Sequence, residues 1–188
     1  MTLGQSMLVI GAITLLGILV LNANTTILQS TTTMDTSEFG ITAVSLATSL
    51  VEESMGKMFD EVIADSNTGM ISLETQLTPV SNLGPDGGEA YRSGALDFDD
   101  FDDFNNIFLV YKSNVAGDTV STPGSTWETI VPGIRAKYFV RANVTYVNYL
   151  QLDSVSAART WHKKILVTVT STGSPDTLRF PAIMSYWN

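Results

Sequence analysis

The sequence predicts an α+β fold in which one long N-terminal helix, apolar in its first half and amphipathic in its second half, packs on a C-terminal antiparallel β-sheet head. Three observations predict it. Residues 1–34 carry no charged side chain, residues 41–62 repeat apolar side chains every three to four positions, and residues 107–188 are rich in β-branched and aromatic residues. We expect the helical region over residues 1–66 and a globular β-rich head over residues 67–188.

The first element is an apolar helix long enough to cross a bilayer. A helix from Leu3 to Leu21 would span roughly 28 Å, close to the thickness of the hydrocarbon layer. We expect residues 1–24 to form a transmembrane segment or the core of a filament. A secretory signal peptide is disfavoured because no Lys or Arg precedes the apolar run, and a plain single-pass anchor would show cationic residues at its cytoplasmic flank.

The helix is predicted to change character after residue 24. Residues 25–40 are rich in Thr and Ser, and β-branching makes Thr a modest helix former, so the helix could loosen there. Gly40 is a candidate bend. The amphipathic pattern that follows predicts a helix covering a core as far as about residue 65, and residues 66–69, Ser-Asn-Thr-Gly, supply a stop.

Four segments of the second half read as strands, namely residues 107–112, 135–152, 163–171 and 177–187. The turn at residues 171–176, STGSPD, predicts that the last two form an antiparallel hairpin. Pro181 within the last strand indicates an edge or a bulge, because proline cannot donate to a ladder.

An acidic motif, LDFDDFDDFNN at residues 96–106, lies between helix and sheet. One interpretation is a solvated turn anchored by Phe98, Phe101 and Phe104. The other is a calcium site, since crowded carboxylates repel one another unless solvent or a cation relieves them. The spacing does not match an EF-hand loop. The candidate calcium ligands are Asp97, Asp99, Asp100, Asp102 and Asp103.

Composition excludes several classes of function. The 188 residues contain no Cys and one His, which excludes disulfides, thiolate metal sites and a multi-histidine metal centre. A net charge of −9 argues against nucleic-acid binding.

His162 suits a surface or edge position, and GPDGG at residues 84–88 is a turn without the features of a phosphate loop. We expect no enzymatic activity and no cofactor other than the possible calcium.

The N-terminal residues resemble those of type IV pilins and pseudopilins. Mature chains of that family begin with Met or a hydrophobic residue, then Thr-Leu, a variable residue, Glu and an apolar run. Met1, Thr2 and Leu3 match, Leu8 to Leu21 supplies the run, and Gln5 replaces the glutamate. The resemblance implies an already processed major subunit whose cleaved leader carried the basic residues. In the family, the glutamate is thought to pair with a neighbouring chain's terminal amine. The amide of Gln5 can accept a hydrogen bond but has no charge, so the departure implies a weaker pairing here.

The resemblance also implies function and partners. The chain would be the structural subunit of an extracellular type IV pilus-like filament, which is a homopolymer. Before assembly the subunit would lie in the inner membrane. A prepilin peptidase and a pilus assembly machinery are the other implied partners. A type II secretion pseudopilin and a membrane-anchored adhesion domain remain alternatives. Asn24 and, less favourably, Asn143 stand in glycosylation sequons. The expected filament-core residues are Met1, Leu3, Gln5, Met7, Leu8, Ile10, Leu15, Leu16, Ile18, Leu19 and Val20.

Overall fold

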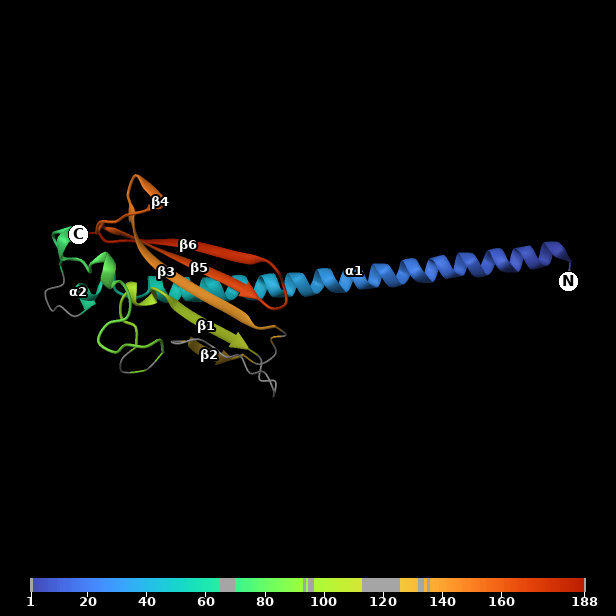
Figure 1. Ribbon diagram of the computed structural model, residues 1–188, viewed down its shortest axis with the longest axis horizontal. Coiled ribbons are helices and arrows are strands. Elements are labelled where there is room, and N and C mark those ends of the chain that lie inside the picture. Colours follow the sequence, from blue (N-terminus) through green and yellow to red (C-terminus); the bar gives the residue numbers. More distant parts are fainter. Residues whose placement is uncertain are drawn as a thin grey trace. The chain divides into compact units, whose positions relative to one another are not determined.

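The computed structural model describes residues 2–64, 70–92, 94, 97–112, 126–131, 134 and 136–187. It confirms the α+β class: a 53-residue helix, α1 (Leu3–Met55), is packed through its C-terminal part on an antiparallel sheet (Figure 1). The chain divides into two compact units, Met1–Gly40 and Ile41–Asn188. We call them the N-terminal unit and the C-terminal unit and describe each by itself.

Helix α1 is continuous through the Thr-rich segment and through Gly40, so the predicted loosening at residues 25–40 is wrong. Thr lowers helix propensity only modestly, and the helix tolerates a run of such residues. Hydroxyl groups along this segment find partners by donating to backbone carbonyls three or four residues earlier. These donors are Thr25, Thr26, Thr31, Thr32, Thr33, Thr36 and Ser37.

The helix ends at Met55, about ten residues earlier than the sequence predicts. After Gly56 the backbone leaves the helix and pairs with the acidic motif. Met58 N donates to Asp99 O over 3.1 Å, and Phe101 N donates to Met58 O over 2.9 Å. The four-residue helix α2 (Glu61–Ala64) follows. Residues 66–69, where the stop was predicted, lie outside the described residues.

The C-terminal unit contains a six-stranded sheet in the order β2-β1-β3-β5-β6, with β4 paired to β3 (Figure 1). The strands are β1 (Ile107–Lys112), β2 (Thr126–Ile130), β3 (Tyr138–Asn148), β4 (Gln151–Val155), β5 (His162–Ser171) and β6 (Thr177–Ser185). Five of them pair antiparallel, whereas β2 joins β1 in parallel. Three short 3-10 helices, η1 (Glu74–Gln76), η2 (Val80–Asn82) and η3 (Asp102–Phe104), precede β1.

The predicted strands are largely confirmed. Strand β1 has the predicted bounds, β5 and β6 form the predicted hairpin, and Pro181 lies on β6 at one end of the described strand order. The predicted strand over residues 135–152 is wrong in its length. The chain turns at Tyr149 and Leu150, where Asn148 Oδ1 accepts a hydrogen bond from Leu150 N over 3.0 Å, and β4 returns along β3. Strand β2 was not predicted.

The core of the C-terminal unit lies on one face of the sheet. Alternate residues of β3 and β5 are buried there, as expected for strands with one covered face. Ala43, Ala47 and Leu50 contribute the buried side of α1. Strand β5 supplies Ile165, Val167 and Val169 to this row, and the same alternation places Lys163 in it.

Candidate functional site

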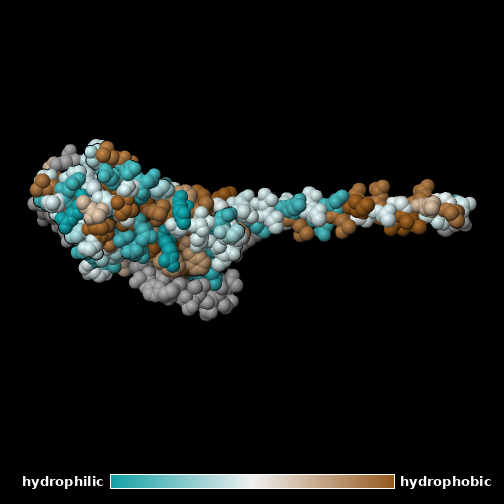
Figure 2. Space-filling model, turned by 45° about the horizontal axis from the view of Figure 1, so that its top comes forward, coloured by the Kyte–Doolittle hydropathy of each residue, from teal (hydrophilic) through white to brown (hydrophobic). Residues whose placement is uncertain are grey.

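The N-terminal unit presents an apolar helical surface to its surroundings. Side chains from Leu3 to Leu21 are exposed, with Leu3 at 82%, Leu16 at 62% and Val20 at 57%. In Figure 2, hydrophobic residues, drawn in brown, occupy much of the N-terminal half of α1. Among the described residues, α1 is the one helix long and apolar enough to cross a membrane, with a mean hydropathy of 2.3 over its most apolar window. Because the segment is apolar on all sides, it is suited to burial in lipid or among other helices.

The predicted filament-core residues lie together on this surface. Met1 lies outside the described residues, and the rest are exposed on α1: Leu3, Gln5, Met7, Leu8, Ile10, Leu15, Leu16, Ile18, Leu19 and Val20. Gln5 has a local role, because its Oε1 accepts a hydrogen bond from Thr2 N over 3.3 Å. The amide thereby caps a backbone donor of the first helical turn, a group that would otherwise lack a partner within the helix.

The candidate glycosylation residues are both exposed. Asn24 lies within α1, and Asn143 lies on β3, where its Nδ2 donates to Asn106 Oδ1 over 2.9 Å. Glycosylation at either residue stays a prediction.

His162 begins β5 and is half-buried, with Nδ1 2.7 Å from Ser185 Oγ on β6.

The three phenylalanines of the acidic motif anchor it, as one of the two interpretations predicts. Phe98, Phe101 and Phe104 are at most 1% exposed. The turn is not solvated, however, because Asp100, Asp102 and Asp103 are also buried. Backbone N–H groups donate to Asp100 and Asp103, and Lys163 Nζ contacts Asp102, so each of the three buried side chains has a polar partner. The sequence did not reveal this, since an acidic run usually indicates a solvated surface.

Two of the buried carboxyl groups of the motif accept hydrogen bonds from backbone N–H groups within it. Asp100 Oδ1 accepts from the backbone N of Asp102 and of Asp103, over 2.8 and 3.1 Å. Asp103 Oδ2 accepts from the backbone N of Asp99 and of Asp100, over 3.0 and 3.1 Å. Burial, followed by the charges of Asp102 and Asp103, raises the pKa of Asp100 to about 10, so that this carboxyl is protonated at neutral pH.

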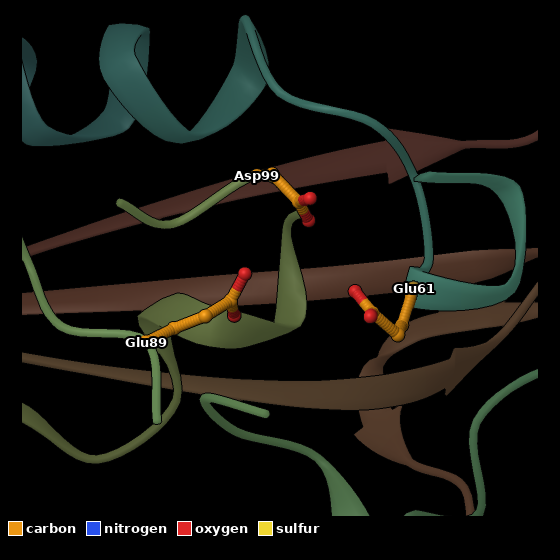
Figure 3. Close-up of side chains that lie close together, drawn as sticks. All are labelled: Glu61, Glu89 and Asp99. Atoms are coloured by element: carbon orange, nitrogen blue, oxygen red, sulfur yellow. The ribbon is translucent and has the colours of Figure 1, made fainter. Parts of the chain in front are cut away.

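The five predicted calcium ligands do not gather around one point. Asp97 Oδ1 accepts from the backbone N of Arg92, over 2.6 Å, and Asp102 contacts Lys163. Asp99 instead lies with two glutamates that the sequence did not single out. The carboxylates of Glu61, Glu89 and Asp99 point toward one another (Figure 3). Each offers one oxygen, and these three oxygens lie within 4.8 Å of one another. Such oxygen ligands suit a hard cation such as Ca²⁺.

Elements far apart in the chain position these three carboxylates. Glu61 begins α2, and Asp99 is held by the backbone pairing with Met58. Glu89 follows a turn in which Gly87 and Gly88 have φ values of 51° and 95°, and its N donates to Asp86 O over 2.8 Å. These positive φ angles are ones that glycine adopts without strain.

Glu89 is expected to make the stability of the C-terminal unit depend on pH. Burial and the nearby Asp103 raise its pKa to about 7. Between about pH 4.5 and 7 the folded protein therefore binds more protons at Glu89 than the unfolded chain does, and the free energy of unfolding falls as pH rises through this window. Between these pH values the melting temperature should fall less steeply with rising pH for Glu89→Gln than for the wild type. Identical pH slopes would contradict this assignment.

Calcium is expected to raise the melting temperature if the three carboxylates hold it, because a ligand that binds only the folded state stabilises it. The rise should be larger at about pH 8 than at about pH 5, where protons compete for Glu89. Asp99→Asn should remove the response, whereas Asp97→Asn should retain it. The reverse pattern would favour a site formed by Asp97 and other aspartates of the acidic motif without Asp99. No response in the wild type would contradict both candidate calcium sites.

A buried ionic network forms the second feature of the C-terminal unit. Lys163 Nζ lies 2.7 Å from Asp60 Oδ2, contacts Asp102 Oδ1, and donates to Phe59 O over 2.8 Å. The Lys163 and Asp60 side chains are 0% exposed, and that of Asp102 is 2% exposed. The sequence analysis missed this network. The one available signal was a lysine at a buried position in the alternating pattern of β5.

The carboxylate of Asp60 is at the centre of this network. It accepts from Thr78 N over 3.0 Å and from Thr78 Oγ1 over 3.1 Å. Tyr146 Oη lies 3.2 Å from Asp60 Oδ2 and 2.8 Å from Thr78 O. The oxygens of Asp60 therefore have several polar partners in addition to Lys163.

The comparisons with known proteins identify no relative: no family model, no curated protein and no solved structure matches this chain.

Proposed function

We propose that this chain is the structural subunit of an extracellular type IV pilus-like filament and polymerises through its N-terminal helix. The observation that carries the proposal is the exposed, uncharged apolar surface of residues 3–21 of α1. A pilin-like architecture, in which a long apolar helix precedes a β-sheet unit, supports it. In this role the chain needs no catalytic group, and its principal partner is another copy of itself.

The physical basis is an exchange of environments. Each large aliphatic side chain removed from water contributes roughly 2.5 kcal/mol, and lipid and neighbouring helices both provide that burial. The preference for the filament must therefore come from close packing and from many simultaneous contacts. A heterologous contact that does not close on itself repeats without limit and produces a helical polymer.

The proposal includes a sequence of locations and partners. The apolar helix is held in the inner membrane first, where a prepilin peptidase would be a partner, and an assembly machinery of the type IV class then moves it into the surface filament. Gln5 would take part differently from a glutamate in the same place, because its Oε1 already accepts from Thr2 N of the same chain and carries no charge. We propose no role in nucleic-acid binding.

Electron microscopy of native surface preparations tests the proposal. Filaments that bind an antibody against the C-terminal unit are the expected result. If the same antibody detects only detergent-soluble monomers, the chain is a membrane-anchored binding domain. Short fibres found only with a secretion apparatus would instead indicate a pseudopilin. The first of these alternative results contradicts polymerisation, and the second contradicts a surface pilus.

A further inference from the structure

The side-chain amine of Lys163 is enclosed in the C-terminal unit together with two carboxylates. Its Nζ contacts Asp60 Oδ2 at 2.7 Å and also contacts Asp102 Oδ1. The ring centroids of Phe59 and Tyr146 lie 4.7 and 5.3 Å from Nζ. Because none of the three ionisable side chains is more than 2% exposed, aromatic and backbone groups replace water around them.

A buried environment of this kind favours a neutral product over a pair of charged groups. Burying an ionised amine and an ionised carboxylate is costly even when they are paired, because each loses its hydration. An amide carries no charge, and its formation from the pair releases one water molecule. The fixed contact between Nζ and the carboxyl group also removes the entropic cost of bringing the reactants together.

The two carboxylates differ in how many other donors hold them. Asp60 accepts from Thr78 N, Thr78 Oγ1 and Val62 N and is also contacted by Tyr146 Oη. These bonds hold the Asp60 carboxylate in a fixed position beside Nζ, within reach of its protons. Asp102 contacts Lys163 through Oδ1 and is the first residue of η3. We therefore assign Asp102, which has fewer donors, as the electrophile, and Asp60 as the group that transfers the protons.

We propose that Lys163 and Asp102 condense into an intramolecular amide bond, with Asp60 as the base that transfers the protons. Asp60 removes a proton from the ammonium group, and the freed Nζ lone pair attacks Cγ of Asp102. The Cγ–O bond breaks, the departing oxygen takes up two protons that Nζ has lost, and water leaves. Asp60 ends as a carboxylate. An ammonium and a carboxylate become one amide and one water, so no oxidant, reductant or other reactant is required.

The bond would join η3 to β5 across 61 residues of sequence. Since the chain has no cysteine, it has no disulfide that could provide such a link. The amide would fix the acidic motif to the middle of the sheet. This inference does not depend on polymerisation and holds equally for an anchored monomer.

Mass spectrometry of the full chain, purified from its native source and digested after denaturation, tests the proposal. We expect a branched peptide that contains both Lys163 and Asp102 and is lighter than the sum of the two linear peptides by one water. The linear peptides should be absent. Detection of the linear Lys163 peptide alone would overturn the proposal, and a branch to Asp60 would overturn the assignment of the acceptor.

Variants separate the chemistry from mere proximity. Lys163→Arg retains a cation but should yield only linear peptides. The neighbouring Lys164→Arg is the matched control and should retain the branch. Asp102→Asn should give the same branched peptide as the wild type with ammonia leaving in place of water, whereas Asp102→Ala should give none. A branch that persists in Asp102→Ala would contradict the proposal. If a variant fails to fold, the wild-type digest still decides.

Discussion

Leu16→Asp is expected to abolish filaments while leaving the C-terminal unit folded. Leu16 is 62% exposed and lies near the middle of the uncharged segment of α1. A carboxylate there costs about 2.5–3.5 kcal/mol in the bilayer centre on insertion scales. Among packed helices it would be a buried charge without a partner, and the cost would recur in every subunit. Negative-stain microscopy of surface preparations measures the outcome.

Two controls make the test specific to the apolar helix. Leu16→Met retains size and apolar character and should form filaments. Leu150→Asp adds the same charge at an exposed position between β3 and β4 of the C-terminal unit and should also form them. The amount of each variant in the membrane fraction separates failed insertion from failed assembly. Filaments from Leu16→Asp would show that this helix is not their core.

Lys163→Met is expected to lower the free energy of unfolding by about 3–5 kcal/mol, because it leaves two buried carboxylates without their cation. For a unit of this size that corresponds to a fall in melting temperature of about 10 °C. If Lys163 is joined to Asp102 by an amide, the same substitution also removes the cross-link, and the direction is unchanged. Near-ultraviolet circular dichroism of the solubilised chain during heating measures it.

The neighbouring lysine is the matched control. Lys164 Nζ lies 3.8 Å from the fully exposed Asp153. Because this contact is long and its carboxylate is fully exposed, the pair contributes about 0–1 kcal/mol, and Lys164→Met, at a side chain that is 13% exposed, should change the melting temperature little. Equal effects of the two substitutions would show that the buried network around Lys163 does not stabilise the fold.

The sequence predicted elements whose signal is local. The apolar run of α1 needs no partner to be recognised, since its length and lack of charge are properties of consecutive residues. Strand β1 and the β5–β6 hairpin were predicted for the same reason, from side-chain type, alternation and a turn. The anchoring role of Phe98, Phe101 and Phe104 also followed from their spacing.

Elements set by distant partners were not predicted. Helix α1 ends at Met55 because the backbone at Met58 pairs with residues 99 and 101, a contact that no local pattern indicates. Strand β2 is held by parallel pairing with β1. The grouping of Asp99 with two glutamates was not predicted, because an acidic run does not show which carboxylates face one another in the folded chain. Glu61, Glu89 and Asp99 meet only in the folded chain.

The sequence by itself therefore determined the α+β class, the apolar helix on which the proposed polymerisation depends, and most strands of the sheet. Tertiary structure alone decided the environment of the ionisable groups. Lys163 lies 103 residues from Asp60 and 61 from Asp102. Helix and strand periodicities arise from neighbouring residues along the chain, whereas a buried ion pair arises when packing removes water from groups that are remote in sequence.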